Sequence, residues 1–218
     1  MKRFALPTFA LLGAFVLGAC SDAVTSPDLA SPDAASERRA PAPSQSSIVD
    51  IVAASVAAED PEFTLLNAAI GYIVETNPGS ALIAGLLDND QYTVFAPTDA
   101  AFGNLVGAVA GLLDPNVLDK DGPFAAIDDL LGAGTIEAVV SYHVAEGRRA
   151  ANSVVPPVRS PRARTIETLL AGATFDVTSA GEIIAVGNTA SIVIPNVSAS
   201  NGIVHVIDAV ILPIDLGL

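Results

Sequence analysis

The segment Tyr92–Phe102, with the sequence YTVFAPTDAAF, decides the fold of this chain. Its first half is aromatic and β-branched, which is typical of a buried strand. Pro97 ends that run, and Thr98 and Asp99 are residues that cap helices. A strand that turns at once into a helix needs local acceptors for the unpaired N–H groups of the first helical turn. We therefore predict a strand, then a helix from Ala100, with Asp99 acting as a cap rather than as a catalytic acid.

The residues before this segment have helical patterns. Ser47 and Asp50 form a capping-box-like start, followed by apolar residues at helical spacing. A second helix is predicted from Asp60-Pro61, because proline is tolerated at the first helical position. Residues 77–79 (NPG) end it, and Ala81–Leu87 is a short apolar helix. The predicted buried stripe of the second helix is Phe63, Leu66, Ile70 and Val74.

The residues after residue 170 have strand patterns. Thr174–Thr178 alternates between apolar and polar residues, Gly181 turns the chain, and Glu182–Val186 returns as the second strand of a hairpin. Ala190–Ile194 is predicted as a further strand. Pro195 is expected to end it, because proline cannot donate to a strand ladder.

A second informative segment, NGIVHVIDAVILP, covers residues 201–213. It begins with a turn and continues as an apolar strand. In an extended strand Ile203, His205 and Ile207 share one face, so His205 is predicted to be a core histidine that holds strands together. A metal-ligand role for His205 is the alternative, but a closed zinc site would need carboxylates that the sequence does not identify, and no metal is assigned.

The first 19 residues have the features of an export signal. Lys2 and Arg3 precede an almost wholly apolar run over Phe4–Phe15, and small residues follow up to Cys20, the only cysteine. A single cysteine cannot form an internal disulfide. LGAC at residues 17–20 resembles the bacterial lipobox, which implies cleavage before Cys20 and lipidation of its thiol. An ordinary signal peptide with an incidental cysteine, or an uncleaved N-terminal anchor, are the alternatives.

Residues 20–47 are predicted to form a lipidated, disordered tether. They are rich in Ser, Ala and Pro, so they cannot bury enough surface to offset the entropy of ordering. Lipid chains anchor a protein at a membrane, and no other apolar run reaches the roughly 20 residues that a spanning helix needs. We therefore expect a domain over residues 48–215 that is exported and lipid-anchored at a bacterial cell envelope. The sequence does not decide between the outer membrane, the cell surface and the periplasmic side as its location.

The charge balance narrows the class of partner. Without residues 1–19 the chain has 8 basic and 24 acidic residues, a formal net charge of −16. Binding to nucleic acid needs clustered Lys and Arg, so nucleic acid is excluded as a general partner. The hydrophobic content of 51% is ample for one domain with its own core.

Most of the remaining basic residues fall in one stretch that three prolines interrupt. This stretch is predicted to be an irregular or hairpin arm on the surface. Its arginines could bind an anionic partner, such as an acidic polysaccharide or the phosphates of lipopolysaccharide. Pairing with the protein's own carboxylates is the interpretation we favour. The residues are Arg148, Arg149, Arg159, Arg162 and Arg164.

A ladder of small residues occupies the middle of the chain. Gly103, Gly107 and Gly111 are spaced as in helices that pack closely. The surrounding apolar run is too short to cross a membrane. Close packing of one helix inside the domain is therefore expected.

An acidic segment follows with partial likeness to a calcium loop. Asp119, Asp121, Gly122 and Asp128 fall at calcium-loop positions. Val117 stands at the first ligand position, however, and the last has Asp in place of the usual bidentate Glu. We predict a solvated acidic loop.

A third motif, TIEAVVSYHVAEG at residues 135–147, completes a set. Together the three motifs resemble, in family order, the signature stretches of the fasciclin domain, over about Ser47–Pro213. The resemblance implies a single fasciclin-like domain of α+β class, in which N-terminal helices pack on a β-sheet wedge of short mixed strands. Helices early in the chain and alternating strands later favour the α+β class independently. The stretch Gly103–Asp129 departs from the pattern, either as a variable loop or as an insertion.

Tyr142 and His143 match a Tyr-His pair common in this family. In some animal members the pair lies in a stretch implicated in integrin binding, so the resemblance makes both residues binding candidates. Integrin itself is not expected for a bacterial lipoprotein. If Val140–Ala145 is extended, the two side chains point to opposite faces. Core packing of Tyr142 and backbone bonding by His143 is the interpretation we favour.

The resemblance implies a non-enzymatic adhesion or interaction module that binds surface proteins or glycans, without a cofactor. The sequence has no G-x-S-x-G elbow and no Gly-rich phosphate loop. His205 with Asp208 lacks an identifiable nucleophile. A structural envelope lipoprotein without a discrete ligand is one alternative, and an unrecognised hydrolase is the other.

Overall fold

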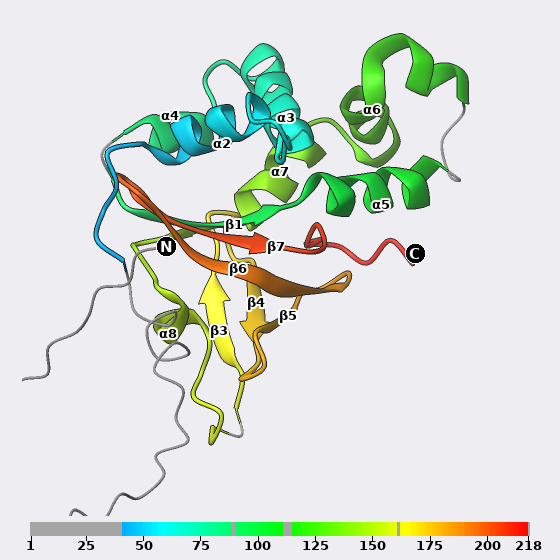
Figure 1. Ribbon diagram of the computed structural model, residues 1–218. Helices are drawn as coiled ribbons and strands as arrows, with labels where there is room; N and C mark the ends of the chain where they lie inside the picture. The colour runs from blue at the N-terminus through cyan, green and yellow to red at the C-terminus, as the bar shows by residue number, and fades with distance from the viewer. Residues whose placement is uncertain (1–40, 89, 111–114, 161, 218) are drawn as a thin grey trace, which may run out of the picture. The chain divides into compact units, whose positions relative to one another are not determined.

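A layer of helices covers one side of a mixed sheet in the computed structural model (Figure 1). The structure describes residues 41–88, 90–110, 115–160 and 162–217. The helices are α2 (Ile48–Val56), α3 (Thr64–Thr76), α4 (Ala81–Leu87), α5 (Asp99–Ala110), α6 (Pro115–Leu131), α7 (Thr135–Tyr142) and α8 (Ala151–Val154). The strands are β1 (Tyr92–Pro97), β2 (Val144–Glu146), β3 (Arg164–Glu167), β4 (Thr174–Val177), β5 (Glu182–Ile184), β6 (Thr189–Ala199) and β7 (Gly202–Ile207). The predicted α+β class is confirmed.

The two informative segments are neighbours in the sheet. The described strands follow the order β2-β1-β7-β6-β5-β4-β3. β1 and β7 run parallel, from Tyr92 opposite Gly202 to Pro97 opposite Ile207, whereas the other pairs are antiparallel. β6 pairs with β5 at its start and with β7 along the rest of its length, so it joins the two halves of the sheet.

The central strands β1 and β7 are buried along their whole length because side chains on both faces enter a core. Val94 and Val206 belong to the core beneath the helices. Phe95 and Ile207 belong to a second core shared with β3, β4 and β5. There Phe95 meets Phe175 edge to face, with ring centroids 5.0 Å apart. Alternation along each strand therefore stabilises two cores at once.

Helix α3 begins at Thr64, so the predicted start at Asp60-Pro61 is wrong. Phe63 precedes it in the left-handed conformation (φ 63°), with no side-chain cap of its own. A distant residue supplies the cap instead, because Asp99 accepts hydrogen bonds from the N–H groups of Thr64 (3.1 Å) and Leu65 (2.9 Å). A cap from another element is invisible to a local sequence pattern.

The buried face of α3 also differs from the prediction. Leu66 is buried as expected, but Ala69 and Ile73 complete the buried stripe. Ile70 is only half-buried, and Val74 is 44% exposed. The buried stripe thus follows i, i+3 and i+7 spacing from Leu66. The sequence pattern missed it because Ala69 is small and does not stand out as a core residue.

Strand β6 continues through Pro195, contrary to the predicted stop. The pairing with β7 shifts register between Ile192 and Ile194 and again between Ile194 and Val197. Asn196 adopts a positive φ of 64° at the second irregularity. Proline fits at such a bulge because the ladder lacks a regular hydrogen bond there.

Two predictions for the middle of the chain are wrong. Gly103 and Gly107 are exposed, and no atom lies within 4 Å of a Cβ placed on either, so they make no close helix contact. Gly111 lies outside the described residues. The acidic segment is the helix α6, kinked at Gly122 (φ 78°), and not a solvated loop.

Several local predictions are confirmed. Ser47 and Asp50 form the complete capping box of α2. Helix α3 ends at Thr76 before Asn77, and α4 has the predicted bounds. The hairpin of β4 and β5 is also present, with shorter strands than predicted. In each case the pattern involves residues close together in the sequence.

Candidate interaction surface

An exposed loop joins α8 to β3, and we call residues 155–163 the arginine loop. The Ser160 N–H donates to the Pro157 carbonyl (2.7 Å), which places Val158 and Arg159 at the corner of a turn. Val158 is 72% exposed, and Arg159 and Arg162 are exposed as well. Figure 1 shows this loop beyond the start of β3, on the side of the sheet opposite α2 and α3.

The other arginines of this stretch bond to backbone. The Arg149 Nε donates to the Glu146 carbonyl at 3.0 Å. The Arg164 guanidinium donates to the carbonyls of Asn152 and Ser153. The favoured interpretation, that the arginines pair with carboxylates, is wrong for these residues, because their described partners are carbonyl oxygens. Carbonyls at the end of the short helix α8 present unpaired acceptors that a guanidinium can satisfy.

Arg148 is a structural residue at the edge of β6 and β7. Its guanidinium donates to the carbonyls of Ala199 (2.9 Å), Gly202 and Pro41 (3.1 Å) and to the Ser198 hydroxyl (2.8 Å). Burial lowers the pKa of Arg148 from its usual value. A guanidinium so fully engaged holds chain segments together and offers little to a partner.

The end of the predicted tether contacts the domain at the same edge. Besides the bond from Arg148 to the Pro41 carbonyl, the Ser198 hydroxyl donates to the Ala42 carbonyl (2.5 Å). The Ser200 N–H donates to the Ser46 carbonyl (2.8 Å). Pro41, Ala42 and Ser46, which fall in the segment predicted as disordered, therefore bond to the domain, and its contacts begin before residue 48. Residues 1–40, with Cys20 and the predicted signal peptide, lie outside the described residues.

Tyr142 and His143 are buried where α7 passes into β2, so Val140–Ala145 is not extended as supposed. Tyr142 ends α7, is fully buried, and donates its hydroxyl to the Thr174 carbonyl (2.8 Å). His143 Nδ1 bonds to the Val139 carbonyl (2.7 Å), and Nε2 accepts from the Ile211 N–H (3.0 Å). This pattern requires neutral imidazole with the proton on Nδ1. Burial lowers the pKa of His143 to about 4.

His205 is fully buried beside Phe95 of the second core, with ring centroids 5.5 Å apart and ring planes tilted by 35°. Its Nε2 bonds to the Arg149 carbonyl (2.9 Å), and Nδ1 accepts from the Asn196 N–H (3.2 Å). Because Nδ1 accepts this bond, the pattern requires the neutral ring, and burial lowers the pKa of His205 in the same direction. His205 thus connects β7 to the bulge of β6 and to the segment after β2.

Thr98 caps helix α5, whereas Asp99 caps helix α3. The Thr98 hydroxyl accepts from the Ala101 N–H (3.2 Å) and so caps α5. Asp99 caps α3, and its carboxylate also accepts a short bond from the Thr64 hydroxyl (2.5 Å). The prediction that these residues act as caps gave the correct chemistry but the wrong helix for Asp99.

The sequence had marked Asn201 only as part of a turn. Its buried side chain accepts from the Ile48 N–H (2.8 Å) and donates to the Leu86 carbonyl (2.9 Å). Next to it, a Cβ on Gly202 would lie 2.1 Å from the Tyr92 carbonyl oxygen. The Asn-Gly pair therefore joins α2, α4 and β1, which only the assembled fold can reveal.

The pair His205 and Asp208, considered in the sequence for acid-base chemistry, bonds to backbone groups instead. Asp208, the partner considered for His205, accepts from the Ser191 N–H instead (2.6 Å). Within residues 41–217, apart from the gaps given above, no group of three or more His, Cys, Asp or Glu could hold a metal ion. No helix among these residues is both long and apolar enough to cross a membrane.

The family profile described as Fasciclin domain matches residues 79–213, more than half of the chain. The chain belongs to the fasciclin family. All three motifs of this fasciclin domain lie within residues 79–213, and two of them contain the parallel strands β1 and β7.

Two similar proteins come from Mycobacterium bovis. Immunogenic protein MPB70 of Mycobacterium bovis is 34% identical over 174 residues, which cover 79% of this chain and 74% of that protein. Cell surface glycolipoprotein MPB83 of the same species is 29% identical over 161 residues, covering 73% and 60%. Among solved structures, a FAS1 domain pair from the insect cell adhesion molecule Fasciclin I aligns with a TM-score of 0.41 and 16% identity, over 67% of this chain and 44% of that one.

Proposed function

We propose that this fasciclin domain is a non-enzymatic interaction module at the cell surface, held by lipid on Cys20, and that the arginine loop contacts an acidic polysaccharide. The sequence motif at Cys20 supports the anchor, and a relative named as a cell surface glycolipoprotein supports the location.

The observation that carries the polysaccharide contact is the state of Arg159 and Arg162. Arg159 is exposed at the turn and Arg162 is exposed after it, and within the described part of the chain neither guanidinium has a hydrogen-bond or ion-pair partner. Guanidinium groups bind carboxylate and sulfate oxygens in pairs. On a chain with a formal net charge of −14, these two cations form a local site that an anionic polymer can approach.

Binding of alginate to the lipoprotein in detergent tests this proposal. Changing both Arg159 and Arg162 to Ser should weaken binding at least about tenfold at low salt, and rising salt should weaken binding to the unchanged protein. The Arg159→Lys, Arg162→Lys variant is the matched control, because it keeps the charge and loses only the paired geometry. Dextran, a neutral polymer, should not bind.

Two results would contradict the proposal. One is alginate binding that persists unchanged in the Ser variant. The other is binding that does not respond to salt.

A further inference from the structure

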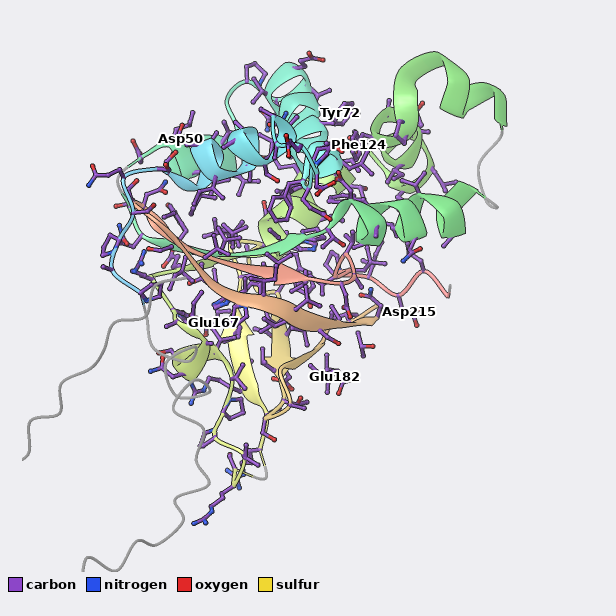
Figure 2. The ribbon with its side chains drawn as sticks, viewed as in Figure 1. Asp50, Tyr72, Phe124, Glu167, Glu182 and Asp215 are labelled. Atoms are coloured by element: carbon purple, nitrogen blue, oxygen red, sulfur yellow. The ribbon has the colours of Figure 1, made fainter. Side chains whose placement is uncertain are left out.

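An apolar cavity lies within the helical layer, far in the sequence from the arginine loop. It holds about 30 Å³, and the surface that lines it is apolar throughout. Its walls come from α3, α5, α6, α7 and the C-terminal tail, which we define as residues 212–217. In Figure 2, Tyr72 and Phe124 lie close together between α3 and α6, where their ring centroids are 6.2 Å apart. A cavity without polar groups offers water no hydrogen bonds and is suited to an apolar occupant.

A second hollow of about 180 Å³ lies beside the first. Leu105, Leu212 and Leu216 line both spaces. One residue of α5 and two residues of the tail therefore stand between the hollows. Displacement of the tail would join them into one longer channel along α5, which is apolar in the first hollow and is bordered by Asn104 and Asn188 in the second.

The tail is fixed at only one end. The Leu212 N–H donates to the Asn188 side chain (3.0 Å), and the Leu212 carbonyl accepts from the Gly187 N–H (3.1 Å). Beyond Leu212, the only hydrogen bond of the described tail is internal, from the Gly217 N–H to Asp215. Ile214 is 43% exposed although it lines the cavity. Beyond Leu212 the tail is thus held by the close approach of the Ile214 backbone to Gly187 and by the apolar contacts of its side chains, and a hydrocarbon can replace these side-chain contacts.

We propose that this channel binds a single neutral hydrocarbon chain, which takes the place of Ile214 and Leu216 of the tail. The narrow, wholly apolar cavity fits an unbranched chain better than a polar or bulky ligand. None of the residues that line the two hollows is basic, so an uncharged alcohol or ester should bind better than a fatty-acid anion, whose charge would find no partner there. This inference does not depend on the arginine loop, and either proposal can fail alone.

Titration of the full chain with 1-decanol, followed through methyl NMR signals, tests the channel. Saturable shifts are expected at the methyl groups of Ile136, Leu105 and Leu212, and decanoate should bind at least about tenfold more weakly at neutral pH. Val106→Phe, which fills the cavity from α5, should abolish the shifts. Val186→Phe is the matched control, because Val186 is 63% exposed and does not line the cavity.

Val139→Phe fills the cavity from α7 and serves as a second variant in case Val106→Phe does not fold. Ile214→Ser should have the opposite effect on decanol affinity. It weakens the contacts of the tail with the cavity, so the tail competes less with decanol, which should bind several-fold more tightly. In the double variant with Val106→Phe that gain should disappear, which separates channel binding from general loosening. Absent or unsaturable shifts in the unchanged protein, or decanol binding that survives both Phe variants with their fold intact, would overturn the proposal.

Discussion

At the scale of single residues, the two histidines show how a polar side chain becomes part of a core. Each ring donates one hydrogen bond and accepts another, so neither can take up a proton without losing an acceptor. Their sequence context identified them as family-motif and core candidates. Burial and both bonding partners were not predictable, because each ring bonds at least one segment that is distant in the chain.

His143 should make the domain sensitive to mild acid. Its folded pKa of about 4 lies below the ordinary 6.5, so the unfolded chain takes up the proton first as the pH falls. The contribution to stability is therefore complete above pH 6.5 and is lost progressively between pH 6.5 and about pH 4, by roughly 3 kcal/mol. Free energies of unfolding in urea across this range should fall less steeply in His143→Gln than in the unchanged protein. An NMR titration midpoint near 6.5 for His143 would contradict the assignment.

At the scale of elements, patterns that lie within a few residues were predictable and those that depend on a distant partner were not. The capping box of α2 and the hairpin of β4 and β5 use neighbouring residues. The start of α3 depends on Asp99, 35 positions from Thr64 in the sequence. The passage of β6 through Pro195 depends on a bulge that only pairing with β7 defines.

Loss of the Asp99 carboxylate should remove the hydrogen bonds that join the start of α5 to the start of α3. Asp99→Ala removes the acceptor for the first N–H groups of α3 and should lower the free energy of unfolding by about 2 kcal/mol. Asp215→Ala is the control at an exposed position, and its change should stay within about 0.5 kcal/mol. Urea denaturation of both variants gives the comparison. Equal free energies of unfolding for the Asp99→Ala variant and the unchanged protein would mean that the cap contributes nothing measurable.

At the scale of the whole molecule, the sequence predicted the fold class and the family but not the surface. Three motifs in family order identify a scaffold, since their residues mostly serve packing, capping and turns. The five arginines looked like one arm in the sequence, whereas folding leaves only Arg159 and Arg162 without partners among the described residues. The apolar cavity is lined by residues from five segments of the chain, so no local sequence pattern could predict it.

The predicted lipid on Cys20 can be tested by partitioning. The unchanged protein should enter the detergent phase of a Triton X-114 extract of producing cells, and Cys20→Ser should remain in the aqueous phase, because lipid chains supply the membrane affinity. Incorporation of labelled palmitate into the unchanged protein alone is the accompanying measurement. A Cys20→Ser variant that stays with the detergent would point to an uncleaved apolar anchor.

The parallel pairing of β1 with β7 also determines when the domain can fold. The partners lie more than a hundred residues apart, and β7 is the last strand of the described chain. Contacts between such distant segments require a long loop to close first, which slows folding. A chain made from its N-terminus cannot complete its central sheet until β7 is available. Until then β1 lacks its parallel neighbour, so the sheet closes late in folding.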